Sequence, residues 1–193
     1  MGAWTLLYAS TDPTRSSPFF PAFTKAFGEE QANQIYFITD TIPSGIKDIE
    51  EATQTYDTEE GTLVSRVKVA ALQGLSSSLM TTRSAITVSD NSNGGCATVE
   101  IKVETTKPEK STLESLLPGF LKDVVQSVPP FPSGSWLESV KSGSSKVVFD
   151  EVYCDDKLRV SRYANELAEY GSEVFVWKRK SFAADNDANV IDL

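Results

Sequence analysis

The chain contains no histidine, and this absence limits the chemistry that its side chains can perform. Histidine is the side chain best suited to proton transfer near neutral pH, and it is the commonest metal ligand. Without it the chain has no Ser–His or Cys–His nucleophile and no ordinary zinc enzyme site. Catalysis by carboxylates or lysines does not need histidine. A site of that kind requires its own group of closely placed residues.

The acidic pairs and the cysteines do not form such a group. The pair 155–156 stands in a predicted tight turn, and the pairs 50–51 and 59–60 are typical of solvated surface. Cys96 and Cys154 have no metal-ligand spacing, and we favour a reduced pair over a disulfide. We therefore expect no enzyme activity, no metal site and no required cofactor.

The acidic composition excludes nucleic acid as a partner. The formal net charge is −9, with 18 Lys and Arg against 27 Asp and Glu, whereas a phosphate backbone needs clustered cations. For the same reason we expect any membrane contact to be driven by apolar burial rather than by anionic lipid. No apolar run approaches the roughly 18 residues of a spanning helix, so we do not expect an integral membrane protein.

The length of 193 residues, 40% of them hydrophobic, fits one domain with a sizeable core. We assign residues 1–182 to this domain, and we expect the polar, acidic segment 183–193 to be a disordered tail. A strand-like segment begins almost at the first residue, which leaves no room for a signal or transit peptide. We expect that none exists or that the numbered chain is a processed form.

Alternation of apolar and polar side chains predicts strands along most of the chain. Val99, Ile101 and Val103 alternate with charged residues and form the clearest half-buried strand. The turn-forming segment 90–95 predicts a hairpin between this strand and the one before it, at 79–89. Further strands are expected at 3–10, 45–56, 62–71, 146–154, 157–162 and 173–179.

Two segments predict helices. The first starts near residue 16, although Pro21 would interrupt a helix that had already begun, and the second is an apolar stripe at 113–128. Either segment packs on the rest of the domain or docks on a lipid surface or a partner, and both interpretations stay open. The docking candidates in the first segment are Phe19, Phe20, Phe23 and Phe27.

Seven or eight antiparallel strands with two or three flanking helices predict a mainly β protein. Strands with alternating faces commonly close on themselves, because closure removes exposed edges. We therefore expect an antiparallel lipocalin-like β-barrel. A β-sandwich is the alternative that the pattern does not separate from it.

The C-terminal hairpin resembles the closing signature of the plastid lipid-associated protein, or fibrillin, family. Residues 153–162 (YCDDKLRVSR) place an acidic turn before Leu-Arg-Val-Ser-Arg, and residues 174–178 (VFVWK) match the short final strand. Residues 2–8 (GAWTLLY) are similar to the family's first strand, so the resemblance runs from about residue 2 to 178. One departure is the segment 163–172, which is longer than the family usually has there.

The resemblance implies a lipocalin-like barrel in a plastid, at thylakoid or plastoglobule surfaces. It further implies non-catalytic binding or organisation of apolar molecules such as carotenoids, prenylquinones and other lipids. The alternative is a peripheral structural subunit that docks on a photosynthetic membrane complex and holds no stable ligand. A weaker third hypothesis, an enzyme or enzyme cofactor protein of isoprenoid metabolism, has no visible site.

Strand parity assigns a set of apolar side chains to the inside of the predicted barrel. A barrel of about eight strands is either filled by side chains or just wide enough for one ligand, and both alternatives stay open. The candidates for lining a ligand site are Leu63, Val67, Val69, Met80, Ile86, Val88, Val99, Ile101 and Val103.

Arginine is also expected inside the barrel. Arg162 shares parity with Leu158 and Val160, so we expect it to point inward. A buried guanidinium needs a partner, and stacking on the indole of Trp4 would provide one. We predict that this pair closes one end of the barrel and is structural, whereas Arg159, of opposite parity, faces solvent or an acidic partner.

Overall fold

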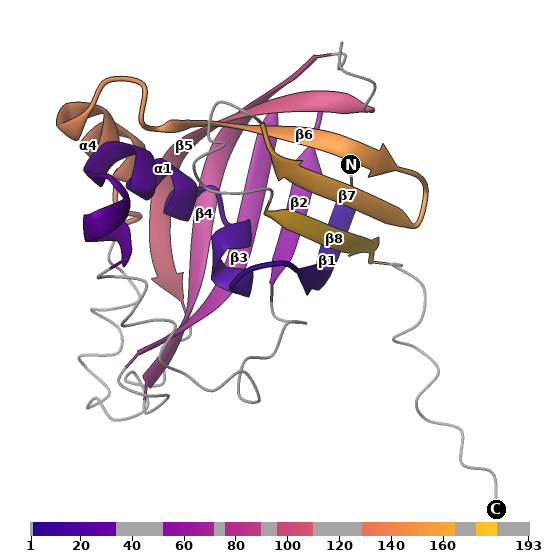
Figure 1. Cartoon of the computed structure of the whole chain (residues 1–193), viewed down its shortest axis with the longest axis horizontal. Helices are drawn as coiled ribbons and strands as arrows, with labels where there is room; N and C mark the ends of the chain where they lie inside the picture. The colour runs from indigo at the N-terminus through magenta and orange to yellow at the C-terminus, as the bar shows by residue number, and fades with distance from the viewer. Residues whose placement is uncertain are drawn as a thin grey trace, which may run out of the picture.

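The structure is a computed structural model that describes residues 2–33, 52–71, 76–89, 96–109, 129–164 and 173–180 (Figure 1). For residues 69–71 and 76–77 only the backbone is described. The strands are β1 (Gly2–Ala9), β2 (Thr53–Asp57), β3 (Thr62–Ala71), β4 (Ser76–Ser89), β5 (Ala97–Glu109), β6 (Lys146–Cys154), β7 (Leu158–Tyr163) and β8 (Val174–Arg179). The helices are η1 (Pro13–Ser16), α1 (Phe19–Phe27) and α4 (Ser133–Val140).

The strands form a closed antiparallel barrel. Each strand pairs with the next one along the chain, and β8 pairs with β1 to complete the circle. This up-and-down order is the one that lipocalins have. The prediction of a barrel is therefore confirmed, and the sandwich is excluded.

Most strand predictions are confirmed to within a few residues, and β3 and β6 have the predicted bounds. The hairpin of β4 and β5 is present, with Ile86 opposite Ile101. Helix α1 begins at Phe19, so Pro21 lies in the first turn, where a missing N–H costs no intrahelical bond. The predicted helix at 113–128 and the tail at 183–193 lie outside the described residues.

Helix α4 has no counterpart among the helices predicted from the sequence. The helix packs tightly on β5. A Cβ atom at Gly134 would lie 2.0 Å from the carbonyl oxygen of Val103, so only glycine permits this approach. Leu137 is fully buried, and the hydroxyl groups of Ser133 and Thr106 are 2.8 Å apart.

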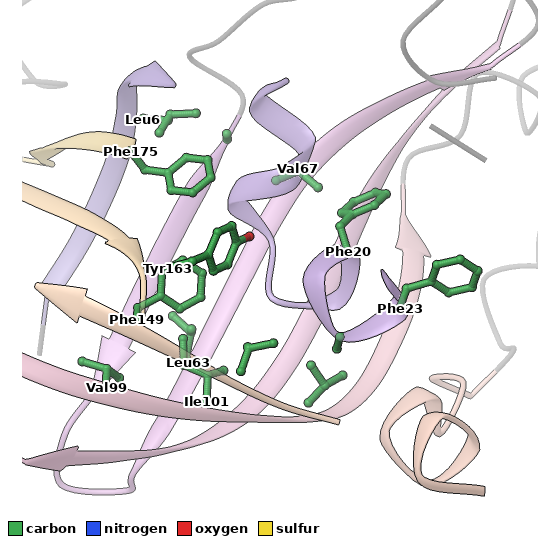
Figure 2. Packing of buried hydrophobic residues seen from close by; sticks show 14 of the residues in the cluster. Leu6, Phe20, Phe23, Leu63, Val67, Val99, Ile101, Phe149, Tyr163 and Phe175 are labelled. Atoms are coloured by element: carbon green, nitrogen blue, oxygen red, sulfur yellow. The ribbon is translucent and has the colours of Figure 1, made fainter. Parts of the chain in front are cut away.

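The two ends of the barrel differ in what covers them. The helical end carries η1, α1 and α4, and the last two helices lie against each other (Figure 1). The turn end carries the β2–β3 turn at 58–61 and the β6–β7 turn at 155–157. Between the ends, three rings form the centre of the core: the centroid of Phe149 lies 4.6 Å from Tyr163, and Tyr163 lies 5.8 Å from Phe175 (Figure 2).

Candidate functional site

The centre of the barrel is packed with side chains. Leu6, Leu63 and Phe175 have no exposed surface, and Val67 and Ile101 are 1% exposed. A side chain without exposed surface has no water-sized void beside it, so these residues line no open cavity. The interior around them is close-packed core, as in most small barrels.

The predicted lumen residues mostly lie on the inner face. Leu63, Val67, Val99, Ile101 and Val103 are buried, and Met80 and Ile86 are partly buried against the same core. The side chain of Val69 lies outside the described residues.

Val88 shares the face of the buried Val99, as predicted, but its side chain is 53% exposed. It lies opposite Val99 in the β4–β5 ladder. However, the pairing of β3 with β4 ends at Thr62 and Ala85. Among the described residues, 86–89 of β4 therefore have no strand neighbour on the β3 side, and Val88 lacks the cover that a second neighbour would give.

The prediction for the two arginines of β7 is wrong, and their roles are exchanged. Arg162 does share a face with Leu158 and Val160, but that face is the outer one. The inner face of β7 carries Arg159, which is 4% exposed. The prediction assumed that the apolar face of a strand points inward. In β7 the apolar residues lie on the outer face.

Arg159 is held by aromatic rings. Its guanidinium carbon lies 5.3 Å from the ring centroid of Trp4, 4.5 Å from that of Tyr56 and 5.0 Å from that of Trp177. Such contacts stabilise a cation that has left water. The predicted stacking of an arginine on Trp4 at one end of the barrel is thus present, but the arginine is Arg159.

Two polar groups complete the surroundings of Arg159. Its Nη2 donates a hydrogen bond to Gln54 Oε1 at 2.5 Å, and its Nη1 lies 3.6 Å from Glu151 Oε1. Gln54 in turn donates to the carbonyl of Ser16, which ties this site to η1. Burial raises the pKa of Glu151 although Arg159 opposes the shift, and burial raises the pKa of Tyr56 to about 12. We call Arg159, Glu151, Gln54, Tyr56, Trp4 and Trp177 the arginine cage.

The arginine cage has a structural role, because the groups that surround the guanidinium all belong to this chain and are themselves buried or, for Tyr56, half-buried. Their pairing is incomplete, since Arg159 Nε and Glu151 Oε2 are buried without a hydrogen-bond partner among the described residues. The acidic turns are structural too. Asp155 accepts hydrogen bonds from the backbone N–H groups of Lys157 and Leu158 and from the Tyr153 hydroxyl, and these bonds lower its pKa. Over the described ranges, no three Cys, Asp or Glu side chains gather into a group that would hold a metal ion. Cys96 and Cys154 are free and exposed.

The four phenylalanines of α1 divide between the core and the surface. Phe20 and Phe23 are buried in the core (Figure 2). Phe19 and Phe27 are half-buried against it. For Phe20 and Phe23 the interpretation as a cover for the barrel end therefore holds. Phe20 and Phe23 are therefore not exposed docking residues.

A group of rings, exposed in part, lies around Trp136 of α4. The ring of Trp136 lies 5.2 Å from Phe27, 6.2 Å from Phe23 and 5.9 Å from Phe131, centroid to centroid. Phe131 is 51% exposed, Trp136 38% and Val140, one helical turn beyond Trp136, 43%. We call Phe23, Phe27, Phe131, Trp136 and Val140 the aromatic cluster.

The helices of the aromatic cluster carry almost no charge. Lys25 is the one ionisable residue of α1, and its ammonium donates to the carbonyl of Lys146. Glu138 is the one ionisable residue of α4, and it accepts hydrogen bonds from the backbone N–H groups of Gly143 and Ser145. The two turns of the opposite end contain, by contrast, Glu59, Glu60, Asp155, Asp156 and Lys157.

Phe131 and Trp136 were missed as candidates from the sequence. The segment around Phe131 contains three prolines, which suggested only a loop, and α4 is too short to show a helical period. A usable signal was present nonetheless. Residues 129–137 include two large aromatic residues and no charged one, an unusual composition for a surface loop.

No helix within the described part of the chain is long and apolar enough to cross a membrane. Comparison of the chain with family models, with curated proteins and with solved structures finds no match.

Proposed function

We propose that the protein is a non-catalytic, lipid-associated barrel that sits on the surface of a membrane or lipid body through its aromatic cluster. The observation that carries the proposal is the exposure of Phe131, Trp136 and Val140 together on or beside two helices, α1 and α4, that contain one charged residue each. Aromatic residues of this kind are favoured where one side is apolar and the other is wet.

The energetics favour apolar contact over electrostatic attraction. Full burial of one large apolar side chain contributes about 1.5–3 kcal/mol. Because Phe131, Trp136 and Val140 expose 51%, 38% and 43% of their surface, burying the remainder contributes about 2–4 kcal/mol in total, which gives weak and reversible attachment. The net charge of −9 disfavours anionic lipid. Attachment that rests on apolar burial depends only weakly on salt, because screening acts on charges.

The resemblance to the fibrillin family suggests where this attachment takes place. We place the protein in a plastid, at thylakoid or plastoglobule surfaces, where it organises carotenoids, prenylquinones or other apolar lipids. The close-packed centre of the barrel supports binding at the outer surface rather than inside the lumen. The lipid ligand is thus part of the surface on which the barrel sits.

Flotation tests the proposal. Purified protein is mixed with neutral galactolipid vesicles, or with triacylglycerol droplets coated by the same lipid, and the floating fraction is measured. The triple variant Phe131→Ser, Trp136→Ser, Val140→Ser should lose at least tenfold in binding, which corresponds to about 1.4 kcal/mol. The matched control, Val88→Ser, removes an equally exposed apolar residue from β4 and should bind like the unmodified protein.

Two outcomes would contradict the proposal. Equal flotation of the triple variant and the unmodified protein would mean that another surface carries attachment. Absence of flotation with every lipid, together with binding to isolated photosynthetic complexes that the triple variant loses, would favour the peripheral-subunit alternative instead.

A further inference from the structure

The outer face of the barrel changes character from one side to the other. A sheet face that meets water normally carries polar side chains, and β5 follows this rule with Thr98, Glu100, Lys102 and Glu104 on its outer face. The outer faces of β7 and β8 depart from it. Their outward positions include Leu158, Val160, Val174 and Val176.

The strand registers align part of this apolar surface into one row across four strands. Tyr8 of β1 lies opposite Val176 of β8, Val176 lies opposite Val160 of β7, and Val160 lies opposite Tyr153 of β6. Neighbouring strands are about 4.8 Å apart, so the row is about 15 Å long. The two tyrosines at its ends are 55% and 46% exposed. We call these four residues the outer row.

Both ends of the outer row coincide with irregular pairing. The register of β1 against β8 shifts between Leu6 and Tyr8, and that of β6 against β7 shifts between Glu151 and Tyr153. An extra residue in one strand re-aims the side chains beside it. The two extra residues, Leu7 and Val152, are themselves 49% and 44% exposed, which widens the apolar surface at each end.

Cations flank the outer row on both sides. Arg162 lies two residues beyond Val160 on the outer face of β7, and Lys178 lies two residues beyond Val176 on that of β8. Because β7 and β8 are antiparallel, these two side chains lie on opposite sides of the row. Within the described parts of the chain neither of them has an ion-pair partner, in a molecule whose net charge is −9.

We propose that this face binds an acidic amphipathic segment of another protein. Apolar side chains of the segment cover the outer row, and its carboxylates meet Arg162 and Lys178. Arginine suits this purpose because its planar guanidinium accommodates a carboxylate through two parallel hydrogen bonds. The inference goes beyond lipid association, since none of its residues belongs to the aromatic cluster.

Selection from a displayed library of random 12-residue peptides tests the proposal on the purified full chain. We expect the enriched peptides to combine at least two Asp or Glu residues with large apolar residues. Their affinity should fall at least tenfold for the charge-reversal variant Arg162→Glu, Lys178→Glu, and likewise for Tyr8→Ser, Tyr153→Ser. All four residues are on the outer face, and thermal unfolding confirms that each variant remains folded.

The matched control reverses two exposed cations on the polar side of the barrel, Arg83→Glu with Lys102→Glu, and should leave peptide affinity unchanged. A library that yields no enriched peptide, or peptides rich in Lys and Arg, overturns the proposal. So do acidic peptides that bind the Arg162→Glu, Lys178→Glu variant as well as the unmodified protein. Flotation on lipid is unaffected by any of these outcomes, so the two proposals fail separately.

Discussion

The two ends of the barrel use aromatic side chains in opposite ways. At the turn end, Trp4 and Trp177 are 5% and 1% exposed and enclose the guanidinium of Arg159. At the helical end, Trp136 and Phe131 pack on neighbouring rings and still leave much of their surface in contact with solvent. Aromatic residues thus bury a cation at the turn end, whereas at the helical end they stay partly exposed.

The difference shows how a structural cluster is told from a binding surface. In the arginine cage, the cation has rings, an amide and a carboxylate as partners, all from this chain. In the aromatic cluster, the rings pack on one another, and Phe131 and Trp136 still leave 51% and 38% of their surface exposed. Changes in the cage should therefore alter stability, and changes in the cluster should alter binding.

The largest effect is expected from Arg159→Ala. This change leaves Glu151 buried beside an empty volume, and breaking a buried pair in this way costs about 3–5 kcal/mol. The matched control is Arg162→Ala on the outer face of the same strand, which should cost less than about 1 kcal/mol. Urea denaturation followed by circular dichroism measures both. Equal losses for the two variants would contradict the assignment of Arg159 as the inward residue.

The next effect concerns the attachment of α4. Gly134→Ala places a Cβ atom against the backbone carbonyl of Val103, and such overpacking costs about 1–3 kcal/mol. Because α4 carries Trp136, the same change should also weaken flotation on lipid. The control is Ser135→Ala, which alters the exposed neighbour and should leave both properties intact. If Gly134→Ala reduced neither, α4 would not pack on β5 as described.

Sequence reasoning predicted the barrel well and its surfaces poorly, for a physical reason. Apolar and polar side chains alternate around Val99, Ile101 and Val103 because one face of the strand is buried. This pattern predicted the strands and the hairpin correctly. The same logic failed for β7, where a buried arginine and apolar outer residues invert the usual pattern. Pairing across strands decides such cases, and neither the cage around Arg159 nor the cluster around Trp136 is local in sequence.

A smaller effect is expected from Glu151→Gln. Burial raises the pKa of Glu151, so the folded protein holds this proton more tightly than the unfolded chain does. Stability conferred by the proton is fully present below the ordinary glutamate pKa and is lost as pH rises towards the raised one. The variant should lack this slope in denaturation midpoints measured across acidic pH.

At neutral pH, Glu151→Gln should cost only about 1 kcal/mol, because Arg159 retains its rings and its bond to Gln54. Other shifted groups, such as Glu173, contribute equally to both proteins and cancel in the difference. A pH slope identical in variant and unmodified protein would show that Glu151 titrates alike in the folded and unfolded states.

The smallest change in stability should come from Trp136→Phe, which keeps a ring in the aromatic cluster and should cost less than about 0.5 kcal/mol. Its spectroscopic effect should be large, because Trp4 and Trp177 are buried and Trp136 is the exposed tryptophan. In the unmodified protein, acrylamide should quench Trp136 first, and lipid should shift its emission to shorter wavelength. The variant should lose both responses, whereas Trp4→Phe should keep them. A lipid-induced shift that persists in Trp136→Phe would move the contact away from the helical end.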